Sequence, residues 1–186
     1  MHRESLLKEL ADYAPRYPNE QRIVEQFVAF VAGNVRCFER DCWTGHITGS
    51  TWLVNPAQSH LLLTHHKKLD KWLQLGGHSD GDPDTKAVAL REGVEESGLE
   101  LTMHPQWPEL FDIDVHEIPA RKADPPHFHF DLRYVLLCEG NDSYSVSDES
   151  HDLSWVEIEA LEDYTQEVSI LRMREKWRAR NFTDSV

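Results

Sequence analysis

The sequence contains no long apolar run. No stretch approaches the roughly 18 consecutive apolar residues that a membrane-spanning helix requires. The opening segment, Met1 to Ser5, leads into polar residues and not into the apolar region of a secretory signal. The three cysteines, Cys37, Cys42 and Cys138, have neither zinc-ribbon nor redox-pair spacing. We therefore expect a cytoplasmic protein with reduced thiols and no membrane partner.

Positive charge is also scarce. The chain has 19 lysines and arginines against 33 acidic residues, which gives a formal net charge of −14. A protein that binds a nucleic-acid polymer normally presents a basic face to the phosphates. Here the basic residues are scattered, and polymer binding is disfavoured. A small phosphorylated ligand stays open, because a divalent cation can reverse the sign of the local potential. One basic group, expected to balance a helix terminus, comprises Arg172, Arg174, Lys176, Arg178 and Arg180.

The chain shows no internal repeat and no long Gly/Ser linker, and 186 residues fit one domain of ordinary size. Helical spacing of Leu6, Leu7 and Leu10 predicts a first helix, and a second is expected from Asn19 as N-cap to Gly33. Alternating patterns predict strands at 46–54, 60–66, 111–116, 127–138 and 153–157, and helices return at 83–97 and about 164–180. Strands mixed with few helices favour an α/β or α+β sandwich.

The helix at 83–97 has clear end signals. Asp82 is the expected N-cap, Pro83 suits the first helical position because its missing N–H costs nothing there, and Gly98 suits the C-terminal stop. An apolar stripe is expected to pack this helix on a sheet, and it consists of Ala87, Leu90 and Val94.

Three glutamates lie on the same helix. Glu92, Glu95 and Glu96 stand at i, i+3 and i+4, so their carboxylates project from one side. Such a group is usually a solvated surface. A preceding double glycine, Gly76–Gly77, allows the backbone to approach an ion closely. Because Mg²⁺ prefers oxygen ligands, the combination indicates a metal site.

The segment from Gly77 to Leu99 resembles the Nudix box, in which a glycine is followed by a glutamate and then by an Arg-Glu-apolar-x-Glu-Glu-x-Gly-apolar run. The positions that agree are Gly77, Arg91, Glu92, Glu95, Glu96, Gly98 and Leu99. Two positions differ, since Pro83 replaces the first glutamate and Gly93 replaces an apolar residue. Asp82 or Asp84 could support the loop in place of that glutamate.

This resemblance implies an α/β/α sandwich around a mixed sheet in residues 43–186, preceded by an N-terminal helical extension in residues 1–42. It also implies hydrolysis of a phosphoanhydride bond in a nucleoside diphosphate derivative with Mg²⁺, or alternatively Mn²⁺. Members of the family are often dimers, so a homodimer is possible. The implied ligands of the metal are Glu92, Glu95, Glu96 and the carbonyl of Gly76. Arg91 would orient the glutamates by hydrogen bonding.

A histidine-rich strand follows. In segment 127–134 the residues His127, His129, Asp131 and Arg133 alternate with apolar ones, so one face is polar and is expected to meet solvent or a cleft. Such a row suits phosphate contact, proton transfer or a metal, and an exposed strand with incidental histidines is the alternative. Together with His78 of Gly-Gly-His, it resembles a bacterial Nudix branch. The resemblance places these five side chains at the substrate.

A later acidic loop at 147–152 offers a general base or a further metal ligand. Glu149 is the first candidate and Asp148 the second, with a plain acidic surface loop as the alternative. Stacking on a nucleobase or simple packing is expected for Trp43, Trp72 and Trp107.

Three other functions remain open. A diphosphate isomerase on the same fold would move a proton without releasing phosphate-containing products. A catalytically silent domain would bind a nucleotide without turnover, although the box keeps all three glutamates. A zinc–histidine hydrolase would reveal itself by its metal content.

Overall fold

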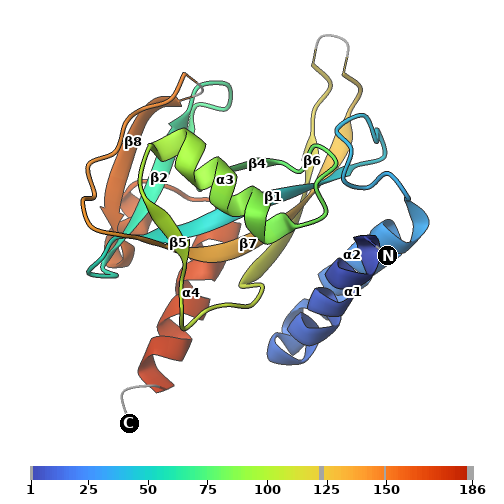
Figure 1. Cartoon of the computed structure of the whole chain (residues 1–186), viewed down its shortest axis with the longest axis horizontal. Coiled ribbons are helices and arrows are strands. Elements are labelled where there is room, and N and C mark those ends of the chain that lie inside the picture. The colour runs from blue at the N-terminus through green and yellow to red at the C-terminus, as the bar shows by residue number, and fades with distance from the viewer. Residues whose placement is uncertain (1, 122–123, 149, 184–186) are drawn as a thin grey trace.

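The computed structural model describes residues 2–121, 124–148 and 150–183. Helices lie on both faces of one mixed β-sheet, so the expected α/β/α sandwich is confirmed. Figure 1 shows α3 across the sheet, the α1–α2 pair to one side of it, and α4 below. The helices are α1 His2–Tyr13, α2 Gln21–Gly33, α3 Thr85–Ser97 and α4 Val168–Thr183, and the 3₁₀ turns are η1 Ala14–Arg16, η2 Pro18–Glu20 and η3 Ile158–Asp163. No described helix combines the length and apolarity needed to cross a bilayer.

The sheet contains eight strands and is built around β1 and β7, which are parallel to each other. Strands β2 and β4 pair with β1 on its other side, and β5 and β6 pair with β7; all four of these pairings are antiparallel. The strands are β1 His46–Val54, β2 His60–His66, β3 Lys71–Leu73, β4 Gly76–His78, β5 Leu101–Met103, β6 Asp112–Ile118, β7 His127–Cys138 and β8 Ser150–Glu157. The alternating pattern predicted the first and last residues of β1, β2 and β7 correctly. It gave no sign of the three-residue strands β3, β4 and β5, which are too short to show a period.

Successive residues of β1 point to opposite faces, and this separates two layers of the fold. On one face Ile47, Gly49 and Thr51 lie under α3, and the neighbouring Phe130 of β7 packs between rings of α2, stacked on Phe30 at 3.9 Å. On the other face Trp52 contacts Trp177 of α4, with ring centroids 6.3 Å apart. The stripe of α4 that the sequence indicates is buried, and its members are Ile170, Met173 and Trp177.

Two expected details of the outer helices are wrong. Helix α2 begins at Gln21 with Glu20 as N-cap, and not with Asn19, because a 3₁₀ turn occupies residues 18–20. Four of the five basic residues of α4 pair with acidic side chains and do not balance a helix terminus, and the side chain of Arg180 lies outside the description. Arg172 and Lys176 instead turn inward to Asp112, at 2.7 Å and 2.6 Å.

Asp112 of β6 is the centre of a buried ionic cluster. Its side chain is fully buried and accepts hydrogen bonds from Arg133 of β7 (3.1 Å) and from Arg172 and Lys176 of α4. Lys176 also donates to the hydroxyl of Tyr13 at the end of α1, at 2.6 Å. Because a buried charge is tolerated only with close partners, this cluster ties the sheet to α4 and to the N-terminal helices.

Candidate functional site

Helix α3, which carries the glutamates, begins two residues later than the sequence suggests. Its N-cap is Asp84, whose carboxylate accepts from the backbone N–H of Ala87 at 3.1 Å. Asp82 accepts from the N–H of Asp84 at 2.9 Å, so both aspartates support the loop before the helix. The choice of Asp82 as N-cap was wrong because an Asp-x-Asp segment offers two equivalent caps. The end is as expected: Gly98 is left-handed with φ 69° and closes the helix.

The face of α3 that packs on the sheet differs from the expected stripe. Val94 is 40% exposed, and the buried residues of the helix are Thr85, Val88, Ala89, Gly93 and Ser97. A Cβ on Gly93 would lie 3.0 Å from Leu101 and 3.2 Å from Leu136. Glycine at this box position therefore reflects a close approach of helix to sheet. A second glycine, Gly49 of β1, makes the same approach from below, since its Cβ would lie 2.9 Å from the carbonyl oxygen of Thr85.

Glu92 lies directly over β4. A Cβ on Gly77 would come within 2.3 Å of the Glu92 carboxylate, so only glycine leaves room for this side chain. Arg91 donates to the carbonyl of His78 at 3.1 Å and lies 3.1 Å from Glu92. The double glycine, the arginine and the first box glutamate thus form one contact surface between α3 and β4.

The remaining box glutamates follow on the same side of α3. Glu96 is half-buried one turn after Glu92, whereas Glu95 is exposed. Carboxylates one turn apart beside a glycine strand match the oxygen ligands that Mg²⁺ takes. Among the described residues, one group of three possible metal ligands has its ligand atoms within 4.8 Å of one another, and it consists of histidines. The oxygens of the three glutamates are therefore farther apart than this.

The polar face of β7 is divided into two halves. Asp131 and Arg133 are 2% and 1% exposed, so the expectation that this whole face meets solvent or a cleft is wrong for these two. Asp131 accepts from Thr48 (2.8 Å), Ser50 (2.7 Å) and Arg133 (2.8 Å). Alternation revealed that these side chains share a face, but not that Arg133 would be compensated there by Asp131 and by Asp112 of the neighbouring β6.

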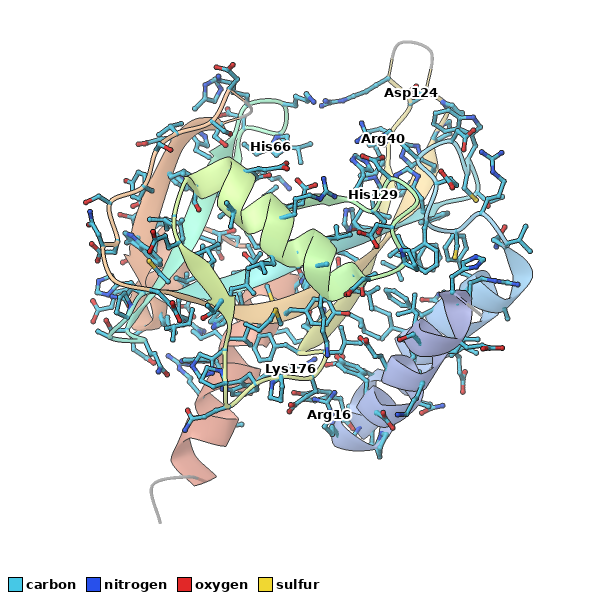
Figure 2. The ribbon with its side chains drawn as sticks, viewed as in Figure 1. Arg16, Arg40, His66, Asp124, His129 and Lys176 are labelled. Atoms are coloured by element: carbon cyan, nitrogen blue, oxygen red, sulfur yellow. The ribbon has the colours of Figure 1, made fainter. Side chains whose placement is uncertain are left out.

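The other half of that face contributes to a cluster of imidazoles, shown around the label of His129 in Figure 2. His46 of β1 is 1% exposed, and its ring lies 4.8 Å from that of His127 and 4.7 Å from that of His129. His78 of β4 closes one side, 5.0 Å from His46 and 5.1 Å from His129. His116 of β6 lies 5.4 Å from His129. We call these five residues the histidine cluster.

Sequence reasoning missed His46 and His116 as members of the cluster. Both stand directly beside His129 in the sheet, through the pairings of β1 and β6 with β7. A strand ladder brings together residues that are distant in sequence, and a single chain does not show which strands are neighbours. The signal that was present is that 11 histidines occur in the chain and several begin strands.

Burial keeps three rings of the histidine cluster neutral, those of His46, His78 and His129. It lowers the pKa of His46 to about 4, and the nearby His127 ring lowers it further, against an opposing contribution from the Cys42 carbonyl. The pKa of His78 is lowered to about 4, mainly by burial and further by electrostatic repulsion from Arg40 and His46. For His129, burial and the rings of His78 and His46 lower the pKa to about 2. Neutral imidazoles have a free ring nitrogen, which makes them ligands rather than cations.

Of the other candidates, Trp43 borders the histidine cluster, and the rest lie elsewhere or outside the description. Glu149 falls outside the described residues. Trp107 is buried and stacks on Trp177 at 5.4 Å, and Trp72 stacks on His65 at 5.1 Å, whereas Trp43 is 42% exposed and lies edge-on to His127.

A cavity of about 560 Å³ lies between the η1–η2 segment and α4, far along the chain from the box. The cations on its wall, Arg16, Arg172 and Lys176, are paired with Glu109, Asp112 and Glu20. We do not assign it to the chemistry of α3.

No protein-family profile matches the sequence, and a comparison with curated proteins finds no match either. Solved structures do match. An Ap4A hydrolase of C. elegans is 18% identical, with 75% of this chain and 98% of that chain covered and a TM-score of 0.57. The E. coli dihydroneopterin triphosphate pyrophosphohydrolase is 15% identical, with 70% and 92% covered and a TM-score of 0.55.

The Nudix domain of NrtR from Shewanella oneidensis, solved with ADP-ribose, is 16% identical, with 72% and 86% covered and a TM-score of 0.50. Identities this low establish the fold and nothing finer. The chain therefore has the fold of Nudix domains, as the resemblance of its box implied.

Proposed function

We propose that this chain is a metal-dependent Nudix hydrolase that cleaves a phosphoanhydride bond in a nucleoside diphosphate derivative. The observation that carries the proposal is the fit of the Glu92 carboxylate over Gly77, in a space that any side chain at position 77 would fill. The box pattern and the fold support it. The structures with this fold include proteins described as hydrolases of nucleotide derivatives.

Glu92 and Glu96 would hold a Mg²⁺ or Mn²⁺ ion, with the carbonyl of Gly76 and Glu95 at its margin. A bound ion of this kind polarises phosphoryl oxygens and lowers the pKa of a coordinated water. Arg91 fixes the Glu92 carboxylate through their 3.1 Å contact and fixes β4 through the His78 carbonyl. This places the oxygen ligands before substrate arrives, which reduces the reorganisation needed during the reaction.

The partially exposed edge of the histidine cluster, His78 and His129, lies next to this site across β4. His78 faces the rings of His46 and His129, on the other side of β4 from the Glu92 carboxylate, and Asp131 and Arg133 support β7 from within. Contact of His78, His127 and His129 with substrate therefore remains a prediction. A role for Glu149 as general base remains a prediction, as do a homodimer and a cytoplasmic location.

The test is a screen of nucleoside diphosphate derivatives with Mg²⁺ and Mn²⁺, with products separated by chromatography. For a substrate so found, Glu92→Gln should lower kcat at least about 100-fold, equivalent to about 2.7 kcal/mol of transition-state stabilisation. The melting temperature should hardly change, because this change replaces a half-buried carboxylate by an isosteric amide. Glu100→Gln, an exposed acid just beyond α3, is the matched control and should retain wild-type turnover.

Retained turnover in Glu92→Gln would refute the ligand assignment. Tight nucleotide binding by calorimetry with no turnover on any compound would support the silent regulatory domain. A rearranged product that keeps its diphosphate would support the isomerase.

A further inference from the structure

We propose that His46, His127 and His129 form a second metal site, which binds one late first-row divalent ion such as Zn²⁺ independently of the box glutamates. The first reason is convergence. One ligand atom from each of these histidines lies within 4.8 Å of the others, and no other described set of three possible ligands does so. Tetrahedral zinc with Zn–N distances of about 2.0–2.1 Å needs nitrogens about 3.4 Å apart, so small ring adjustments complete the site.

The second reason is that the ring nitrogens lack protein partners. Both ring nitrogens of His46 and Nε2 of His129 are buried without a hydrogen bond of good geometry, although the Cys42 carbonyl lies near the His46 ring. Buried polar atoms in folded proteins are nearly always bonded to protein, water or an ion. A metal ion in the centre of the histidine cluster would accept lone pairs from both rings.

The third reason is that one ring is already oriented as a ligand. Nδ1 of His127 lies 2.8 Å from the carbonyl oxygen of Pro125, so it carries the proton and donates. This leaves the lone pair on Nε2. A carbonyl oxygen that accepts from the other ring nitrogen, and so fixes the tautomer, is the usual companion of a metal-binding histidine.

The surroundings are compatible with a cation. Arg40, whose positive charge acts on His46 and His78, makes two hydrogen bonds to Asp80, at 2.8 Å and 2.7 Å, and is neutralised by it. Imidazoles alone suit zinc, copper or nickel better than magnesium. The fourth coordination position of the ion would face His78, which is partly exposed, so a water molecule could occupy it in place of that ring.

The site lies on the opposite side of β4 from the box. Gly77 faces the Glu92 carboxylate, whereas the next residue, His78, faces the rings of His46 and His129. The two ion sites would therefore be separable by mutation, and the proposal does not depend on the hydrolase assignment.

The experiment uses the full chain without a polyhistidine tag, stripped with EDTA and dialysed. Titration with Zn²⁺ alone by calorimetry should show one tight equivalent, and Co²⁺ alone should give the intense visible absorption of a tetrahedral nitrogen site. His129→Gln and His127→Gln should each weaken the binding of Zn²⁺ at least about 100-fold and abolish that absorption. His151→Gln removes one exposed histidine outside the cluster and should change neither measurement.

Glu92→Gln should keep the zinc equivalent and the cobalt absorption, whether or not the chain hydrolyses anything. If His129→Gln fails to fold, judged by its melting temperature in EDTA, His127→Gln decides. The proposal is overturned if the folded wild-type protein binds no stoichiometric zinc, or if zinc binding survives in both histidine variants. Loss of zinc binding in Glu92→Gln would equally overturn it, because the ion would then belong to the box.

Discussion

The two sides of β4 present opposite chemistries within three residues. Toward α3, Gly77 offers empty space that the Glu92 carboxylate fills, and the proposed ligands there are oxygens on a half-exposed helix. Toward α4, His78 joins imidazoles that burial keeps neutral. One short strand thus separates hard carboxylate oxygens from borderline imidazole nitrogens, because alternate residues of a strand face opposite layers.

The largest effect is expected from Gly77→Ala, which should damage the carboxylate side alone. Its Cβ would meet the end of a flexible side chain, so the Glu92 carboxylate would move and the fold would survive. A displacement of about 1 Å at a reacting centre can cost about 100-fold in rate. We expect kcat to fall by about this factor and the affinity for Mn²⁺, measured by calorimetry, to weaken. The binding of one equivalent of Zn²⁺ should not change. If zinc binding fell in parallel with Mn²⁺ binding, the two sides would not be separate.

Next in size is a matched pair of glycine variants that tests how α3 is seated. Gly49→Ala would place its Cβ 2.9 Å and 3.0 Å from backbone atoms of α3, whereas Gly93→Ala would meet movable leucine methyls. We expect Gly49→Ala to destabilise by about 2–3 kcal/mol, the range of overpacked cores. Gly93→Ala should cost less than about 1 kcal/mol, because alanine also favours the helix. Urea unfolding measures both, and equal effects would mean that α3 does not rest on Gly49.

The histidine side should make the metal-free protein sensitive to acid. The pKa values of His46 and His78 are about 4 in the folded chain, below the ordinary 6.5, so the unfolded chain binds more protons between these values. Stability is therefore complete above pH 6.5 and falls as the pH decreases toward 4. Each group contributes on the order of 2 kcal/mol of loss by pH 5, at about 1.4 kcal/mol per pH unit.

Urea unfolding in EDTA at pH 7, 6 and 5 measures this slope. This slope reflects how many more protons the unfolded chain binds than the folded chain. His78→Gln should reduce that difference by about one proton, while His151→Gln should leave it unchanged. A wild-type stability that is the same at pH 7 and pH 5 would show that the imidazoles are not buried in solution.

The smallest effect is expected at Glu95. This side chain is exposed, unlike the half-buried Glu92 and Glu96. Glu95→Gln should therefore lower kcat less than about tenfold and leave the melting temperature unchanged. A loss as large as that of Glu92→Gln would mean that all three carboxylates close around the ion when it binds.

Alternation predicted the long strands well, because β1 and β7 are long enough to carry a pattern, whereas the α/β/α layers followed from the resemblance of the box. The sequence also predicted Gly98 as the helix stop, since a left-handed residue there favours glycine. What it could not show depends on neighbours brought together by folding. The buried Asp131 and Arg133 resemble surface residues until Thr48, Ser50 and Asp112 surround them. The same holds for His46, which only the ladder with β7 places beside His129.

Asp112 has a consequence for how the molecule comes apart. Through Lys176 and Tyr13 this one carboxylate connects β6 with α4 and with the first helix. Breaking any of these contacts leaves a buried charge of the cluster without a partner, which costs free energy. We therefore expect the amide protons of α1 and of the central strands to exchange with solvent through the same cooperative event, so that residues 1–42 behave as part of the domain and not as an appendage.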